Sequence, residues 1–267
     1  MSIEAICDFD GTITDNSHAY GEYSEEFSLL LIKKFRFSVS EWVDAISLAK
    51  DEILANPKGY GWVDNGYIVA PATSEPLVFF TVIAQLALSK LGKNSTADEL
   101  STIHSKSLEK VELRFRKGAY DFVTNMNRFT SFTIVTNSKE VDTSKKVFLL
   151  LGENNVKVIG NAKKNKINPL WEKVPFSIQL PNFPREVLLR RELYYDAISK
   201  TMPEKAPFVI GDIYELDLAL PEFLKFPTVL VLSHSTPKWE IKYYKAHPNG
   251  FSSNSLQEIE HNIFCRR

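Results

Sequence analysis

Short apolar segments alternate with amphipathic helices in the second half of the chain, and this alternation constrains the fold more than any other feature. The predicted strands are 131–136, 156–159, 207–210 and 227–232, and the predicted helices are 119–128, 141–151, 185–200 and 213–224. One more short apolar strand is predicted at Ile3–Cys7. Because apolar strands that alternate with helices form a parallel sheet with both faces covered, we predict an α/β core.

A block of helical periods separates the first strand from this alternating region. Helices are predicted at 24–37, 40–55, 75–91 and 96–115, with residues 62–74 as a connector. Ser40 is the predicted N-cap of the second helix, and Thr96 with Glu99 forms a capping-box pattern at the start of the fourth. We therefore predict a discontinuous α/β core domain of residues 1–16 and 117–267, with an inserted helical domain of residues 17–116.

The composition limits the partners and the compartment. With 44% hydrophobic and 24% charged residues, the chain has the composition of a folded globular protein. Its 32 basic and 33 acidic residues balance, which argues against a nucleic-acid partner held by bulk positive charge. The longest uncharged apolar stretch, Pro76–Ser89, is shorter than the roughly 20 residues that a membrane span needs.

We expect a cytoplasmic protein without membrane contact. No secretory signal is evident near residue 1, and Cys7 and Cys265 are too few and too far apart for a disulfide framework. The oligomeric state stays open, although an exposed face on the helix predicted at 75–91 would suit a homodimer.

Polar residues follow three of the predicted strands. Asp8 and Asp10 follow the first strand, Thr136 and Asn137 lie at the end of another, and the pair Gly211-Asp212 ends a third. Open α/β sheets bind their ligands at the carboxyl ends of the strands. Carboxylates and a hydroxyl at this edge, with the basic pair Arg190-Arg191 nearby, could hold a hard divalent cation and an anionic group together.

These segments carry a resemblance to one enzyme superfamily. The sequence DFDGTIT of Asp8–Thr14 resembles the first motif, DxDGTxT, of the haloacid dehalogenase superfamily. Ile134–Asn137 resembles its second motif, and Gly211–Asp217 resembles its fourth, GDxxxxD. The resemblance covers residues 1–16 and about 117–235, and the wording of the first motif is closest to the phosphoserine phosphatase-like branch. It implies a Rossmann-like parallel sheet core with an inserted α-helical cap domain of the C1 type.

The resemblance also implies a role for the acidic residues. Asp8 would be the nucleophile that forms an aspartyl-phosphate, and Asp10 would protonate the leaving-group oxygen and then activate water. The Asp8 carboxylate, the Asp10 backbone carbonyl and Asp212 would hold Mg²⁺, which suits a site of oxygen ligands and water. Asp217 fits the second acidic position of the fourth motif, and Glu215 lies close enough to compete for that role.

The same resemblance implies a phosphate-binding set. Thr136, with the backbone amide of Asn137, would bind phosphoryl oxygens, and Gly11 would let the backbone approach the ligand. The third motif of the superfamily is a basic residue on the helix before the fourth motif. Arg190 and Arg191 both have roughly the usual separation from Gly211, and we favour Arg190. The candidates for this role are Arg190, Arg191, Lys164 and Lys166.

These features predict an enzyme, a Mg²⁺-dependent phosphomonoester hydrolase that acts on a small phosphorylated metabolite. A phosphotransferase or mutase is the nearest alternative, because the same aspartyl-phosphate can pass its phosphoryl group to another hydroxyl. A second alternative is a non-catalytic protein that binds a phosphorylated ligand and has kept the fold. The sequence does not specify the metabolite, because one fold hosts many substrates.

Overall fold

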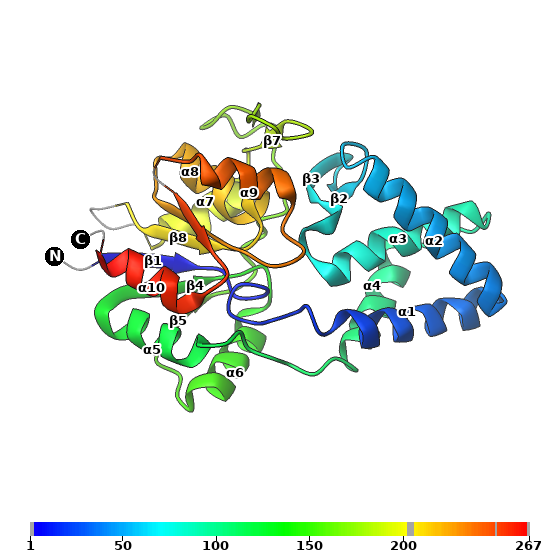
Figure 1. Ribbon diagram of the computed structural model, residues 1–267, viewed down its shortest axis with the longest axis horizontal. Helices are drawn as coiled ribbons and strands as arrows, with labels where there is room; N and C mark the ends of the chain where they lie inside the picture. The colour runs from blue at the N-terminus through cyan, green and yellow to red at the C-terminus, as the bar shows by residue number, and fades with distance from the viewer. Residues whose placement is uncertain (1–2, 202–205, 249, 266–267) are drawn as a thin grey trace. The chain divides into compact units, whose positions relative to one another are not determined.

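A computed structural model describes residues 3–201, 206–248 and 250–265 (Figure 1). Its elements, in chain order, are β1 (Ile3–Cys7), α1 (Tyr20–Phe35), α2 (Val39–Ala55), β2 (Gly61–Asp64), β3 (Tyr67–Pro71), α3 (Pro76–Lys90), α4 (Ala97–Leu108), α5 (Ala119–Phe129), β4 (Thr130–Val135), α6 (Glu140–Leu151), β5 (Lys157–Ile159), β6 (Ser177–Ile178), β7 (Val187–Leu188), α7 (Glu192–Ser199), β8 (Phe208–Gly211), α8 (Ala219–Phe223), β9 (Thr228–Val231), α9 (Lys238–Lys245), β10 (Phe251–Ser253) and α10 (Leu256–Cys265).

Six of these strands form one parallel sheet in the order β10-β9-β8-β1-β4-β5. The predicted α/β class is therefore confirmed. Strand β1 lies between β4 and β8, with Cys7 opposite Ile134 and Ile210. The residues that follow these three positions consequently emerge side by side at the carboxyl edge of the sheet, where ligands bind in open α/β folds.

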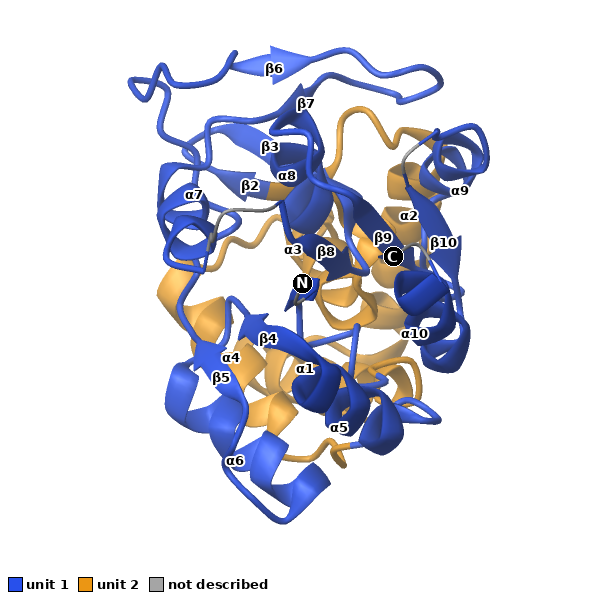
Figure 2. Ribbon diagram, turned by 90° about the vertical axis from the view of Figure 1, so that its left-hand side faces the viewer, with its two compact units in different colours: residues 1–15, 63–70, 114–267 blue, residues 16–62, 71–113 orange. Residues whose placement is uncertain are grey.

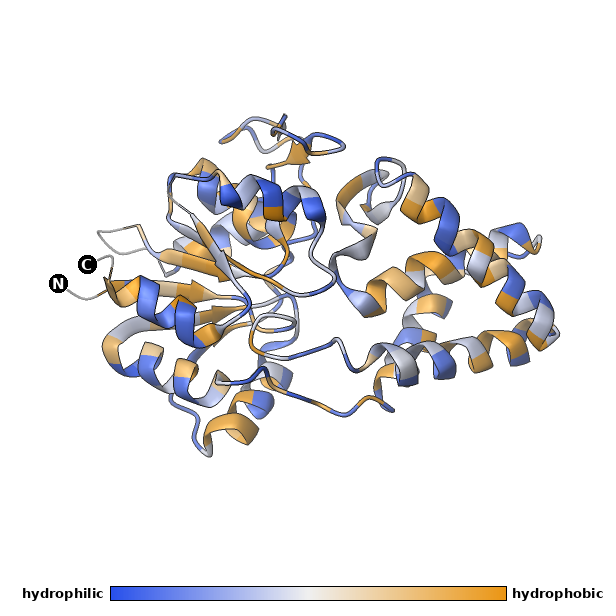
Figure 3. Ribbon diagram, in the orientation of Figure 1, coloured by the Kyte–Doolittle hydropathy of each residue, from blue (hydrophilic) through white to orange (hydrophobic). Residues whose placement is uncertain are grey.

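Hydrophobic clusters cover both faces of the central strands, which explains why strands such as β8 and β9 are mostly apolar (Figure 3). Val209 and its neighbour Ile210 point into two different hydrophobic clusters, as do Ile6 and Cys7. Successive side chains on a strand point to opposite faces, so a strand covered on both sides has few polar positions. The continuous apolar pattern in the sequence is the consequence of this double coverage.

The chain divides into two compact units (Figure 2). The first consists of residues 1–15, 63–70 and 114–267 and contains the sheet, and the second consists of residues 16–62 and 71–113. The second unit packs its helices around buried aromatic and aliphatic side chains, among them Tyr23, Phe27, Trp42 and Phe80. The units differ from the predicted domains mainly in residues 63–70, which group with the sheet although their neighbours on both sides belong to the helices.

Residues 63–70 belong to a β-hairpin, although residues 62–74 were predicted to be a connector. Strands β2 and β3 pair around Asn65 and Gly66, which both have positive φ, at 48° and 82°. An Asn-Gly pair is the preferred sequence for a two-residue hairpin turn, because that turn requires positive φ at both positions. The flanking strands are only 4 and 5 residues long, so their sequence shows little of the alternation that marks longer strands.

The helix caps follow simple local rules, with one correction. Thr96 and Glu99 form the predicted capping box at the start of α4. The N-cap of α2 is Ser38 and not Ser40, and Ser38 forms a second capping box with Glu41. Either serine could cap a helix. Only Ser38 has a glutamate three residues later, Glu41, which can complete a capping box.

Two helices predicted in the first unit are shorter than expected. Residues 185–200 were predicted to be one helix, but only Glu192–Ser199 is helical, and Val187–Leu188 pairs with β6 as a small antiparallel ribbon. Residues 213–224 contain a π-helical turn, Tyr214–Leu218, before α8. Such turns are rare and often lie at functional sites. No helix in the described part of the chain is long and apolar enough to cross a membrane.

Candidate active site

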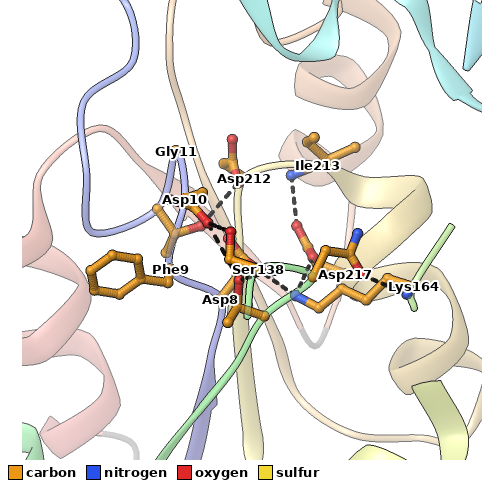
Figure 4. Close-up of polar contacts among 12 residues, drawn as sticks. Asp8, Phe9, Asp10, Gly11, Ser138, Lys164, Asp212, Ile213 and Asp217 are labelled. Carbon is orange, nitrogen blue, oxygen red and sulfur yellow. Dashed lines mark hydrogen bonds and ion pairs between the residues drawn. The ribbon is translucent and has the colours of Figure 1, made fainter. Parts of the chain in front are cut away.

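Three aspartates meet at the carboxyl edge of the sheet (Figure 4). Asp8 follows β1, Asp212 follows β8, and Asp217 lies in the π-helical turn beyond it. Their carboxylate oxygens lie within 4.8 Å of one another, and the residues are only 8%, 6% and 3% exposed. The register of β1 against β8 brings the first two together, and the π-helical turn adds the third.

The ammonium group of Lys164 lies between two of these carboxylates. Its Nζ is 2.6 Å from Oδ1 of Asp8 and 2.8 Å from Oδ1 of Asp217, and the side chain is 2% exposed. The other oxygen of Asp217 accepts a hydrogen bond from the backbone N–H of Ile213, at 3.0 Å. Lys164 therefore gives Asp8 and Asp217 a shared, buried counter-charge.

Burial dominates the protonation of this cluster. It raises the pKa of Asp8 to about 7, although the positive charge of Lys164 opposes the rise. Burial also raises the pKa of Asp212 well above its ordinary value, and the negative charges of Asp217 and Asp8 add to the effect. Burial lowers the pKa of Lys164, but the two carboxylates raise it by more, so the amine stays charged. If all three acids were ionised, Lys164 would balance only one of the three negative charges, and a bound cation would offset the excess.

The side chain of Asp10 lies apart from this cluster. Its Oδ1 is 2.9 Å from the Nζ of Lys146, and its Oδ2 accepts a hydrogen bond of 2.5 Å from the hydroxyl of Ser138. About a third of the Asp10 side chain is exposed, whereas Asp8 is buried. Two carboxylates two positions apart in the sequence thus have different environments, as two different chemical roles would require.

The two arginines predicted to bind phosphate are elsewhere. Arg190 donates to the backbone carbonyls of Val174 and Pro169. Arg191 is fully buried and donates to three backbone carbonyls of the same unit. Neither guanidinium contacts Asp8, so the structure corrects this prediction: the basic residue beside Asp8 is Lys164. The preference for the arginines assumed that residues 185–191 are helical, and they are not.

The structure also distinguishes the other candidates, Lys166 for the basic residue and Glu215 for the second acid of the fourth motif. Lys166 is half exposed and pairs with Asp64 at 2.5 Å. Glu215, the competitor of Asp217, accepts two hydrogen bonds from the guanidinium of Arg185, at 2.8 and 2.9 Å. Burial raises the pKa of Glu215 to about 7, against the opposing charge of Arg185. Of the two acids, Asp217 lies in the cluster with Asp8.

Thr136 and Asn137 both lie at this edge, at the end of β4. The Thr136 hydroxyl accepts a hydrogen bond from the N–H of Ser138 at 3.1 Å and lies 3.5 Å from the carboxylate of Asp10. The side-chain oxygen of Asn137 accepts from the backbone N–H of Lys164 at 2.7 Å. The side chain of Asn137 therefore supports the segment that carries the lysine.

Sequence reasoning missed three polar residues around the first motif. Ser138 and Lys146 bind the carboxylate of Asp10, as described above. Arg116 donates from Nε and Nη2 to the carbonyl of Gly11, at 2.9 and 2.7 Å, and from Nη1 to the carbonyl of Leu232 at 3.0 Å. Ser138 could have been found as the residue after the second motif, but the other two come from positions that carry no sequence signal.

Gly11 has no room for a side chain. Its φ is +88°, and a Cβ built on it would lie 2.3 Å from Oδ2 of Asp212. We expect Gly11→Ala to displace the Asp212 carboxylate and to lower the unfolding free energy by roughly 1–3 kcal/mol through backbone strain. Thermal unfolding and the affinity for Mg²⁺ would measure the two effects.

Gly152 provides the matched control. Its φ is +76° and nothing lies within 4 Å of a Cβ built there, so Gly152→Ala should show the strain without the collision. If both variants had the same Mg²⁺ affinity as the natural protein, the proposed collision with Asp212 would be wrong.

Comparison with known proteins gives a fold. No protein-family model and no curated protein matches the sequence. YfnB from Bacillus subtilis, named as a HAD-hydrolase and solved bound to magnesium, matches with a TM-score of 0.55 at 14% identity, over 98% of this chain and 99% of that chain. A HAD phosphatase from Thermococcus onnurineus matches with a TM-score of 0.50 at 15% identity, over 98% and 97% of the two chains.

A hydrolase from Pseudomonas syringae matches with a TM-score of 0.52 at 15% identity, over 98% of both chains. Identities this low carry the fold and not the activity. The Rossmann-like α/β fold that the resemblance implied is nevertheless confirmed by structures that match almost the whole chain, whereas the C1 type of the cap and the phosphoserine phosphatase-like branch stay predictions. This chain has the haloacid dehalogenase-like fold.

Proposed function

We propose that this protein is a Mg²⁺-dependent phosphomonoester hydrolase that acts on a small phosphorylated metabolite through an aspartyl-phosphate on Asp8. The observation that carries the proposal is the arrangement around Asp8: a buried carboxylate beside Lys164 and two further aspartates, with Asp10 nearby in a more exposed setting. In this proposal, the groups needed for the reaction meet at one edge of the sheet. They are the nucleophile Asp8, its counter-charge Lys164, the aspartates that would bind the metal, and the general acid Asp10.

In this mechanism, a carboxylate oxygen of Asp8 attacks phosphorus while the bond from phosphorus to the leaving-group oxygen breaks. Asp10 donates a proton to that oxygen. Asp10 then takes a proton from a water molecule, and the water oxygen attacks the phosphorus of the aspartyl-phosphate, which releases phosphate and regenerates Asp8. The ammonium of Lys164 orients Asp8 and offsets negative charge as the phosphoryl group is transferred.

The donor set fits a magnesium ion. Asp8, Asp212 and Asp217 offer carboxylate oxygens close together, and hard oxygen ligands are what Mg²⁺ prefers. These residues would hold the ion, which would offset the repulsion between the anionic nucleophile and the anionic phosphate. The Asp10 backbone carbonyl stays a predicted ligand. A magnesium-bound structure with the same fold supports the proposal.

The free energy of unfolding should depend on pH and on Mg²⁺, because the acidic cluster is buried. Asp8 has a pKa of about 7 in the folded chain, against 3.8 ordinarily, so between these values the unfolded chain loses a proton that the folded chain keeps. Stability contributed in this way is present in acid and is lost as the pH rises toward 7, and Glu215 acts in the same direction.

Without metal, we therefore expect thermal unfolding at a lower temperature at about pH 8 than at about pH 5. Adding Mg²⁺ should raise the unfolding temperature most at the higher pH, because it offsets the charge of the ionised cluster. Unfolding temperatures that rise with pH without metal, or that ignore Mg²⁺, would contradict this assignment of the acidic cluster.

Phosphate release from a panel of phosphorylated metabolites, with and without chelation of metal, tests the function. We expect turnover of at least one compound, and its loss on chelation. Adding acceptor alcohols would distinguish hydrolysis from phosphotransfer, because a transferase would make new phosphate esters. Mg²⁺ binding without turnover of any compound would favour the non-catalytic binding protein.

A further inference from the structure

Residues 63–70 form the turn region of the hairpin β2–β3 and are joined at both ends to the helical unit, yet they pack with the α/β unit. Asp64, on β2, is almost fully buried there. One of its carboxylate oxygens lies 2.5 Å from the Nζ of Lys166, and the other accepts a hydrogen bond from the N–H of Ile167 at 3.2 Å. The hairpin therefore binds the segment that follows Lys164.

Arg191 also binds the segment around Lys164, through hydrogen bonds to backbone carbonyls. Its guanidinium donates to the carbonyls of Leu188 (3.3 Å), Val69 on the hairpin (2.8 Å) and Lys164 itself. Burial lowers the pKa of Arg191 to about 10, which still leaves it charged at neutral pH. A planar guanidinium with five N–H donors can serve several carbonyls at once, which the three-donor ammonium of a lysine does less well.

The segment around Lys164 needs such support because it has no regular structure of its own. No helix or strand covers residues 160–176, and Asn161 and Lys163 have positive φ, at 52° and 51°. Catalytic groups must be held to within about 0.5 Å, and irregular segments do this less well than helices or strands. Here the N–H of Lys164 is held by Asn137, its carbonyl by Arg191, and the residues after it by Asp64.

We infer that Arg191 and the hairpin residues 63–70 act together as a clamp that positions the ammonium of Lys164 against Asp8. Arg191 and Asp64 are positioning residues in this account, because neither contacts Asp8 or Asp217. The inference rests on the proposed function for the effect on turnover, but the clamp itself is a property of the fold and can be measured separately.

The test uses the full chain with Asp64→Ala, Arg191→Met and Arg191→Lys, and compares amide hydrogen exchange with the kinetics of phosphate release. The informative amides are those of Lys164 and Ala162, which donate to Asn137 and to the carbonyl of Thr136. Neither is bonded to a mutated residue, so faster exchange there reports a loosened segment. We expect an acceleration of about tenfold at these amides, with the strands of the sheet unchanged.

The kinetics should show that a positioned group has been lost. We expect kcat and kcat/KM to fall together by about tenfold or more in Asp64→Ala and Arg191→Met, as for an interaction made in the transition state. Arg191→Lys, which keeps a charge and part of the hydrogen bonding, should recover part of kcat. The control is Asp142→Asn, at an exposed position on α6 outside the clamp, which should change neither readout.

Two results would overturn the inference that the clamp positions Lys164 for catalysis. If only the Ile167 amide exchanged faster in Asp64→Ala, the hairpin would bind the segment without holding Lys164. If Lys164 and Ala162 exchanged faster while kcat stayed the same, the segment would be clamped but not for catalysis. Should Arg191→Met fail to fold, Asp64→Ala decides alone. If the natural protein turned over no phosphate ester, the proposed function would fail, and the exchange data would still decide the clamp.

Discussion

Asp8→Asn is expected to abolish phosphate release, lowering kcat by roughly four orders of magnitude or more, as the loss of a nucleophile does in other enzymes. An amide cannot carry the phosphoryl group as a carboxylate does. The substitution keeps the shape of the side chain. It removes a buried carboxyl group whose pKa is already raised to about 7 by burial. The folded state should therefore survive, and single-turnover measurements should show no covalent phosphoprotein.

The matched control is Asp142→Asn, on the exposed surface of α6, which should have natural kcat. If Asp8→Asn kept full metal-dependent turnover while remaining folded, Asp8 would not be the nucleophile. If it lost turnover but still formed a covalent phosphoprotein, another side chain would carry the phosphoryl group, and Asp10 would be the next to replace.

Lys164→Met is expected to have the second largest effect, because the ammonium of this lysine pairs with two carboxylates of the buried acidic cluster, those of Asp8 and Asp217. Removing one partner of a buried ion pair typically costs about 3–5 kcal/mol, because it leaves the other charge without compensation. Turnover should fall by about 10²–10³, the usual loss when one group that stabilises transition-state charge is removed.

The pH dependence separates this effect from ordinary loss of packing. Without Lys164, Asp8 can take up a proton in acid and lose its charge, because burial raises its pKa to about 7, so the destabilisation should be smaller at about pH 5 than at about pH 8. Lys163→Met, an exposed neighbour, is the control and should leave both unfolding and turnover unchanged. Natural stability and natural turnover in Lys164→Met would contradict its place in the mechanism.

The sequence by itself determined the fold class and half of the candidate site. Apolar strands that alternate with helices have only one common solution, a parallel sheet covered on both faces. Once the order of the sheet places β1 between β4 and β8, residues directly after these strands must meet. That is why Asp8, Thr136 and Asp212 could be predicted as neighbours: each lies within one residue of a strand end, where register alone sets its position.

Only the tertiary structure decided the basic residue and its support. Lys164 lies in a segment without periodicity, 53 residues from Asp217 and 156 from Asp8, and no local pattern encodes contacts over such distances. Arg191 looked like a phosphate ligand because an arginine near a fourth motif is chemically plausible for that role. In the fold its guanidinium is buried among carbonyls, because irregular backbone inside a protein must find hydrogen-bond donors. The residues at strand ends can be predicted as neighbours from the sequence, because the pairing of the strands sets their positions. The positions of residues in irregular segments depend on tertiary contacts, which form only when the whole chain is folded.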